Sequence, residues 1–128
     1  MQGFPDVELA LCELLESLGP TGTATNEDLS IPIRVNRTGG ASTPFEDHAV
    51  VEVTSWRSTR GESSALSQQI SAALNDARAV ATGAGFIDKI SNTTAPMPLP
   101  DFNPDTRRVS STWTVTSRLQ EIEDAPSP

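Results

Sequence analysis

The sequence predicts an α+β fold, a two-layer sandwich in which two helices pack on a mostly antiparallel sheet of four to five strands. Residues 7–18 and 62–80 place apolar side chains at helical spacing, which predicts the two helices. Several runs between and after them alternate apolar and polar residues, as half-buried strands do. Neighbouring strands favour antiparallel pairing within one domain. We expect this domain to span residues 1–119 and an acidic tail to span residues 120–128.

The first helix is expected to start at Pro5 and Asp6, because proline suits the first helical turn and an aspartate there complements the helix dipole. Gly19 and Pro20 supply its end. The helix buries one apolar stripe, made of Val7, Leu11, Leu14, Leu15 and Leu18. Cys12 lies off this stripe with no neighbouring base, which favours packing over a reactive thiol.

Two strands are predicted next, a short one over 21–25 and a second one around 31–36. Pro32 cannot donate a hydrogen bond to a strand ladder, which places the second strand at a sheet edge. Such an edge is either protected, here by Pro32 and Arg34, or paired with another chain. Protection is the favoured interpretation.

Residues 37–44 are predicted to form a flexible hairpin loop. Gly39-Gly40 is not a phosphate-binding loop, because no Lys-Ser/Thr pair follows and no helix starts there. Phe45 closes this loop as an exposed apolar residue and marks a candidate contact site.

The run 48–56, HAVVEVTSW, is predicted to be a central strand, because apolar residues occur on both of its faces. His48 and Glu52 share one face, an arrangement that an acid–base pair in a small hydrolase would need. No serine in a nucleophile turn and no third partner at a recognisable spacing accompany them. A solvated strand face is therefore favoured, and a hydrolase using His48 is a distant alternative.

The helix over 62–80 is rich in alanine, which lets it lie close to a sheet, and it ends before Gly83 and Gly85. A strand over 86–94 follows. The next segment, 96–105, contains four prolines and is predicted to be an ordered extended loop rather than regular structure. Its apolar anchors are Met97, Leu99 and Phe102.

The longest strand is predicted over 107–119, where Val109, Ser111, Trp113 and Val115 face the core. At about 3.3 Å per residue it spans roughly 40 Å, so it can overhang its sheet. The opposite face meets water or a partner and consists of Arg108, Ser110, Thr112, Thr114, Thr116 and Arg118.

The composition limits the possible functions. The 128 residues include 9 basic and 17 acidic side chains, a net charge of −8. Tight binding to nucleic acid needs a basic surface, whereas an acidic surface lets DNA pass without sticking. The single cysteine and the single histidine exclude an intrachain disulfide and a multi-histidine metal site, and we expect no cofactor. No apolar run suits a membrane span or a signal peptide, so the chain is expected to be cytosolic when made.

The chain resembles the tail terminator proteins of long-tailed, siphovirus-type bacteriophages, particularly those of phages that infect actinobacteria. The resemblance covers residues 4–119 and rests on patterns of fold rather than on a catalytic signature. It is carried by FPDVELALCELL with Gly19-Pro20, by IRVNRTGG, by HAVVEVTSW with the alanine-rich helix after it, and by RRVSSTWTVTSR.

The resemblance implies a structural virion protein, not an enzyme, that assembles as a ring, usually a hexamer, on the last ring of the tail tube. Such a ring ends tube polymerisation and offers an attachment surface to the head or neck connector, while genomic DNA passes through its lumen without specific binding. The implied partners are further copies of the chain, the tail tube protein and a neck or head-completion protein, with no membrane. The implied place is the neck-proximal end of the virion tail, after synthesis in the host cytoplasm. Another neck component, a head–tail connector or a tail-completion protein, is the alternative.

Contact residues are expected in the two loops and on the long strand. The hairpin loop 37–45 and the proline-rich loop 96–105 are the expected docking surfaces. Arg107 and Arg108 either form ion pairs between copies or remain solvated, since exposed pairs contribute little. The candidate interface residues are Arg37, Gly39, Gly40, Phe45, Met97, Leu99, Phe102, Arg107, Arg108, Thr112, Thr114 and Thr116.

Overall fold

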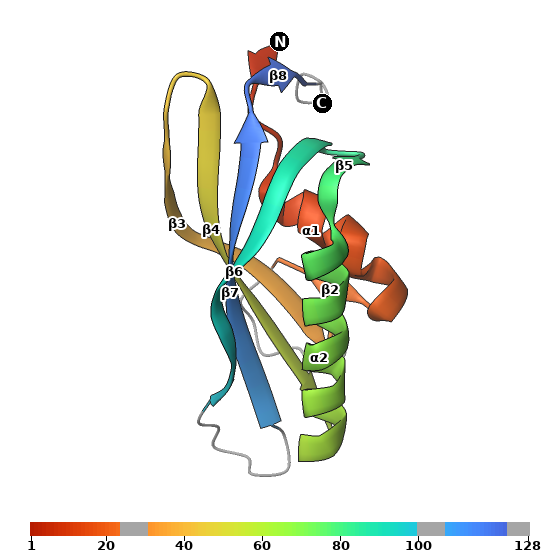
Figure 1. Ribbon diagram of the computed structural model, residues 1–128. Helices are drawn as coiled ribbons and strands as arrows, with labels where there is room; N and C mark the ends of the chain where they lie inside the picture. The colour runs from red at the N-terminus through yellow and green to blue at the C-terminus, as the bar shows by residue number, and fades with distance from the viewer. Residues whose placement is uncertain (24–30, 100–106, 123–128) are drawn as a thin grey trace.

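The computed structural model describes residues 1–23, 31–99 and 107–122, with only the backbone of Leu99 and Arg107. Two α-helices lie on one side of a six-stranded sheet, and a second, two-stranded sheet joins the ends of the chain (Figure 1). The predicted α+β class is confirmed. The expectation of four to five strands was too low, because β5 (Arg78–Thr82), a segment largely expected in the second helix, adds a strand at one edge of the sheet.

The strand order in the large sheet is β2-β3-β4-β7-β6-β5. The bounds are β2 Thr21–Gly22, β3 Ile33–Ser42, β4 Glu46–Arg57, β5 Arg78–Thr82, β6 Gly85–Leu99 and β7 Arg107–Arg118. Among these described strands β2 runs parallel to its neighbour, and the other pairs are antiparallel. The small sheet pairs β1 (Gln2–Gly3) with β8 (Gln120–Glu121), so two residues expected in the acidic tail lie in a strand.

Helix α1 (Val7–Leu15) begins where the sequence predicts, because the Asp6 carboxylate accepts hydrogen bonds from the backbone N–H of Glu8 and Leu9. A 3₁₀ turn, η1 (Glu16–Leu18), continues it to Gly19. Helix α2 (Arg60–Asp76) is capped by the Thr59 hydroxyl.

The prediction that the second helix reaches Val80 was wrong. The chain leaves the helix at Ala77, and residues 78–82 pair with β6 as β5. Val80 lies opposite Ile87, which is fully buried, and packs against the core. Tertiary packing thus decides the state of a segment whose alanines also suit a helix.

The core lies between the helices and the inward face of β4 and β7. Trp113 and Val115 of β7 are fully buried there, which confirms the inward parity predicted for this strand. Helix α1 contacts both β3 and β5, which lie on opposite halves of the strand order, so the sheet curls around the helix layer. The core also includes Leu11, Leu15, Val51, Val53, Ile70 and Leu74.

The predicted hairpin loop is mostly strand. β3 runs to Ser42, and a register shift between Arg37 and Gly39 marks a β-bulge. Gly40 has φ +122°, and a Cβ at this position would lie 2.2 Å from the carbonyl oxygen of His48. Gly40 therefore permits a close approach of β3 to β4, in a segment that is strand rather than flexible loop.

The proline-rich segment is also partly strand, contrary to expectation. β6 continues through Pro96 and Pro98 to Leu99, paired with β7. β5 covers the other side of β6 only as far as Lys89. Proline is tolerated in this part of β6 because its outer side is a sheet edge. Residues 100–106, including Phe102, lie outside the described residues.

The free edge of β3 is occupied by side chains of the same chain. Strand β2 pairs with only the first two residues of β3. Farther along β3, the backbone N–H of Arg37 donates to the Glu8 carboxylate at 3.2 Å, and Arg37 Nε donates to the Gly39 carbonyl oxygen at 3.1 Å. These side chains take the backbone groups that another strand would need. Pro32 and Arg34, the residues predicted to protect this edge, have other positions. Pro32 precedes the strand, and Arg34 is buried against Trp56.

One residue of β5 has an unfavourable backbone conformation. Ala79 has φ +48°, a region that costs a non-glycine residue roughly 1–2 kcal/mol. We expect Ala79→Gly to raise the free energy of unfolding by about 0.5–1 kcal/mol, after the entropy that glycine adds to the unfolded chain. Urea denaturation measures the change. The control is Ala81→Gly, at an exposed position of the same strand without positive φ, which should destabilise; equal effects of the two changes would contradict the explanation.

Candidate assembly interface

The tip of the β3–β4 hairpin presents one apolar side chain to solvent. The hairpin extends well beyond the helices (Figure 1), and Phe45 in its turn is 74% exposed, as predicted. The Thr43 hydroxyl accepts from the backbone N–H of Phe45 and Glu46, and the Leu119 N–H donates to the Phe45 carbonyl oxygen at 2.8 Å. The backbone of Phe45 is thereby fixed, which lowers the entropy lost when its ring binds a partner.

A partly buried ion pair holds the hairpin below this tip. Both terminal nitrogens of Arg37 donate to Asp47 at 2.8 Å, and the Ser42 hydroxyl donates to the same carboxylate at 2.7 Å. Asp47 is 1% exposed. Arg37 holds the pKa of the Asp47 carboxyl below its ordinary value, and the pKa of Arg37 is raised in return. Arg37, predicted as a contact residue, thus positions the hairpin.

Asp47 is the residue of this arrangement that the sequence interpretation missed. It has the parity of Ala49 and Val51, which face the core. A carboxylate at an inward-facing position must find a charged or hydrogen-bonding partner. The inward-facing position of Asp47 was therefore the feature of the sequence that could have indicated this ion pair.

The opposite end of the sheet presents a second apolar side chain. Met97 of β6 is 51% exposed beside Pro96 and Pro98. Met97 pairs with Ser110 of β7. Glu46, at the base of the hairpin turn, pairs with Arg118, eight residues farther along the same strand. The two ends are therefore about 26 Å apart. A cavity of about 550 Å³ lies between this part of β6 and α2 and is lined by Pro96, Pro98, Val109 and residues of α2. The side chain of Leu99, also predicted here, is not among those described.

The outward face of β7 is half-buried rather than open. The hydroxyl of Thr114 lies 2.6 Å from that of Thr93, and the hydroxyl of Thr116 lies 3.3 Å from His48 Nδ1. The Thr112 carbonyl oxygen accepts from the Asn92 amide. These threonines remain predicted contact residues, with hydrogen bonds already formed inside the sheet.

The arginines at the start of β7 lie at the same end as Met97. The Arg108 guanidinium stacks on the Trp56 ring, with its carbon 5.7 Å from the ring centre, and Arg34 lies 5.4 Å from the same centre. Arg108 therefore has a packing role within the chain. The side chain of Arg107 is not among those described.

The structure does not bring His48 and Glu52 together. His48 Nε2 lies 3.1 Å from Glu46, whereas Glu52 accepts from the Thr54 hydroxyl. His48 is thus part of the exposed strand surface near the hairpin, and the hydrolase alternative gains no support from the geometry.

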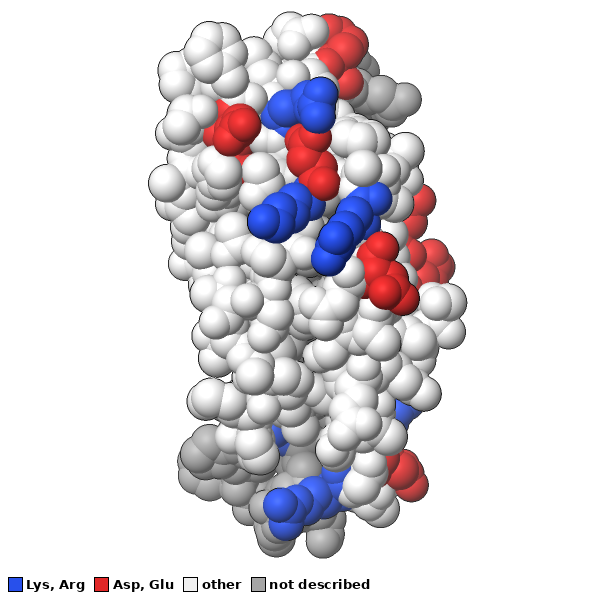
Figure 2. Space-filling view, viewed as in Figure 1, with Lys and Arg blue, Asp and Glu red and all other residues white. Residues whose placement is uncertain are grey.

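The charges around these regions have both signs. Figure 2 shows basic side chains next to acidic ones in the upper half of one face, and a broad uncharged area across its middle. Neither helix in the described part of the chain has the length and apolar character that a membrane crossing requires.

Comparison with known proteins identifies the family. The family model described as phage tail termination protein matches residues 3–121. The chain belongs to this family. The predicted tail terminator resemblance is confirmed, and the chain is a structural component of a bacteriophage virion tail.

A solved structure shares the fold of this tail termination protein. It is a chain of the "Virion of native gene transfer agent (GTA) particle", with a TM-score of 0.57 and 14% sequence identity. The match covers 88% of this chain and 93% of that chain. A search of curated proteins gives no significant match.

Proposed function

We propose that the chain forms a ring, a hexamer, that caps the tail tube, ends tube polymerisation and attaches the head or neck connector. The observation that carries this proposal is the position of two exposed apolar side chains, Phe45 and Met97, at opposite ends of the sheet. A protein inserted between two assemblies needs two contact surfaces that face opposite ways. One end contacts the tube protein and the other contacts the connector.

The charge of the chain suits a ring around DNA. Each copy carries a net charge of −8, so a ring of copies repels the phosphate backbone and lets genomic DNA pass without sticking. Contacts between copies lie at the sides of the sheet, with Thr112, Thr114 and Thr116 as candidates on the outward face. The protein acts at the neck-proximal end of the tail, after synthesis in the host cytoplasm.

Tube growth in the presence of this protein tests the proposal. Purified tail tube protein is polymerised with and without it, and tube lengths and end-bound rings are counted by electron microscopy. Shorter tubes with a ring at one end support the proposal. Unchanged tubes with bare ends would overturn it, and a ring seen only next to the head in a virion reconstruction would identify a connector or completion protein instead.

We expect Phe45→Ala to weaken binding at one end of the protein by about 30-fold, the effect of losing a central apolar anchor of about 2 kcal/mol. Met97→Ala should weaken binding of the partner at the other end of the protein. Both changes should leave the urea midpoint near the wild-type value, because the two side chains are mostly exposed. Pull-down with tube ends and with connector protein measures the two effects separately.

The matched control is Leu9→Ala, since Leu9 is an exposed apolar residue of α1, 56% exposed, away from both ends. It should change neither interaction. Equal losses for Leu9→Ala and Phe45→Ala would show that the hairpin tip has no special part in docking.

A further inference from the structure

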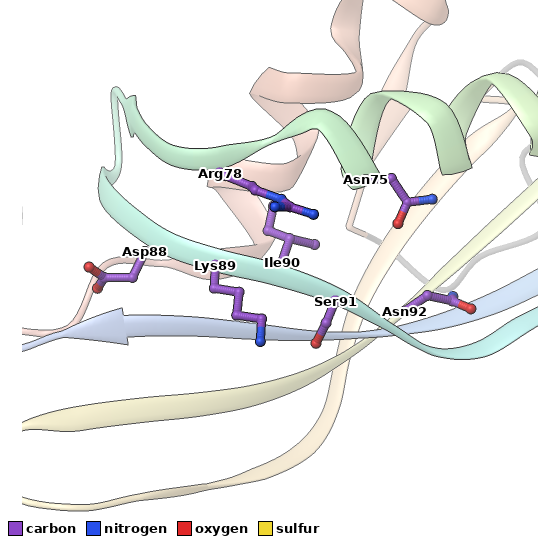
Figure 3. A pocket seen from close by; sticks show the side chains of 7 residues that line it. All are labelled: Asn75, Arg78, Asp88, Lys89, Ile90, Ser91 and Asn92. Atoms are coloured by element: carbon purple, nitrogen blue, oxygen red, sulfur yellow. The ribbon is translucent and has the colours of Figure 1, made fainter.

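A polar pocket lies where the end of α2 meets β5 and β6. Its volume is about 430 Å³, and its walls include Asn75, Arg78, Lys89 and Ser91. Figure 3 shows the Arg78 and Asn75 side chains in the space between the end of α2 and β6, with Lys89 and Ser91 on the adjoining stretch of β6. Neither apolar end of the protein includes this pocket.

Two positively charged side chains, Arg78 and Lys89, line this pocket. Arg78 and Lys89 are direct cross-strand partners of β5 and β6, and both are exposed. Like charges in this position destabilise a strand pair. Within the described residues neither side chain has an ion pair or a hydrogen bond. Asp88 lines the same pocket, but its carboxylate accepts from Arg118.

The sheet edge beside the pocket is closed to strand addition. The Asn92 amide donates to the carbonyl oxygen of Thr94 on the same strand, and the register of β6 shifts on both sides of Thr94. Pro96 and Pro98 then remove two N–H donors from the same strand. A partner at this edge must therefore bind through side chains rather than by extending the sheet.

We infer that this pocket binds a carboxylate side chain of a second copy of the same chain. The chain has 17 acidic side chains against 9 basic ones, so its surface is complementary to the pocket. Glu16 and Glu62, for example, are exposed and have no ion pair within the described part of the chain. A pocket on one copy that binds a different surface of the next copy gives a head-to-tail contact, which forms a ring when the rotation between successive copies closes. The inference rests on the proposed self-assembly and names one contact of it.

The composition allows a direct test, because Lys89 is the only lysine of the chain. Unlabelled and heavy-nitrogen-labelled chains are mixed and treated with a carbodiimide, which joins amines to carboxylates in direct contact. Lys89 and the N-terminal amine are the only amines that can react. We expect mass spectrometry to find Lys89 peptides of one label joined to acidic peptides of the other, increasingly so as the protein concentration rises.

Charge reversal provides a second measurement. Arg78→Glu should weaken self-association in sedimentation velocity by about ten-fold or more, and Arg78→Lys should restore it, because a cation suffices. The matched control is Arg60→Glu, an equal change of charge at an exposed residue at the start of α2, which should leave self-association unchanged.

Three results would overturn the inference. Lys89 crosslinks confined to single copies would exclude a second copy as the occupant, as would an Arg78→Glu variant that associates like the wild type. Protection of Lys89 from acetylation by short duplex DNA or inorganic phosphate, but not by higher protein concentration, would assign the pocket to phosphate instead. If the wild-type chain shortens tubes but shows no crosslinks between copies, the capping function stands and the pocket contact is wrong. If crosslinks form between copies but tubes are unaffected, the pocket contact stands and the capping function is wrong.

Discussion

Replacing Trp113 with alanine is expected to lower the free energy of unfolding by about 3–5 kcal/mol. Trp113 is fully buried in the middle of β7, opposite Val51 on one side and Asn92 on the other. Its indole N–H donates to the Ser111 hydroxyl at 2.9 Å, so the change also removes a buried hydrogen bond. Domains of this size have a total stability of about 5–15 kcal/mol, so much of the variant should be unfolded at physiological temperature.

Urea denaturation followed by circular dichroism measures this loss, and the fluorescence of Trp56, the only other tryptophan, reports the same transition. Trp113→Phe is the control, because it keeps most of the buried apolar volume and should cost clearly less. A loss below about 1 kcal/mol for alanine would show that the core is not centred on β7, since cavities of this size are costly in well-packed interiors.

The parts of the fold that were predictable are those where the local pattern and the tertiary environment agree. Asp6 marks the start of α1 because its capping bonds are local. Alternation placed Trp113 in the core because β7 has the helices on one side only. Val80 was misassigned because its partner Ile87 becomes a neighbour only after the chain turns back at residues 83–84. Pro96 and Pro98 were predicted to lie in a loop, because the sequence does not show which side of β6 lacks a neighbouring strand.

The candidate sites divide in the same way. The exposure of Phe45 and Met97 was predictable, because an apolar residue between turn-forming or proline-rich neighbours has little local means of burial. Their role in contacts stays a prediction. The pair of Arg78 and Lys89 was not predictable, because it depends on the register between β5 and β6 and the first of these strands was assigned to a helix. Side chains that meet across strands require the register, which composition and periodicity leave open.

Replacing Asp47 with alanine is expected to lower the free energy of unfolding by about 2–3 kcal/mol at neutral pH. The change removes the acceptor of two Arg37 hydrogen bonds and one Ser42 hydrogen bond. The cost stays below that of a fully buried pair, because the Arg37 side chain is 36% exposed and can be hydrated once released. Glu46→Ala is the matched control, since this neighbouring carboxylate is exposed and pairs with the exposed ring of His48. It should cost less than about 0.5 kcal/mol.

The destabilisation caused by Asp47→Ala should also depend on pH in a defined direction. Arg37 lowers the pKa of the Asp47 carboxyl in the folded chain. The carboxylate therefore stabilises the folded state above its unfolded pKa of about 3.9, and this contribution disappears as the pH falls through the lower folded value. Urea midpoints of wild type and variant should thus differ most near neutral pH and converge in acid. A difference that stayed constant down to strongly acidic pH would show that packing, rather than the ion pair, holds the hairpin. If the ion pair does hold the hairpin, Asp47→Ala should also weaken docking through Phe45, because the tip would lose its fixed position.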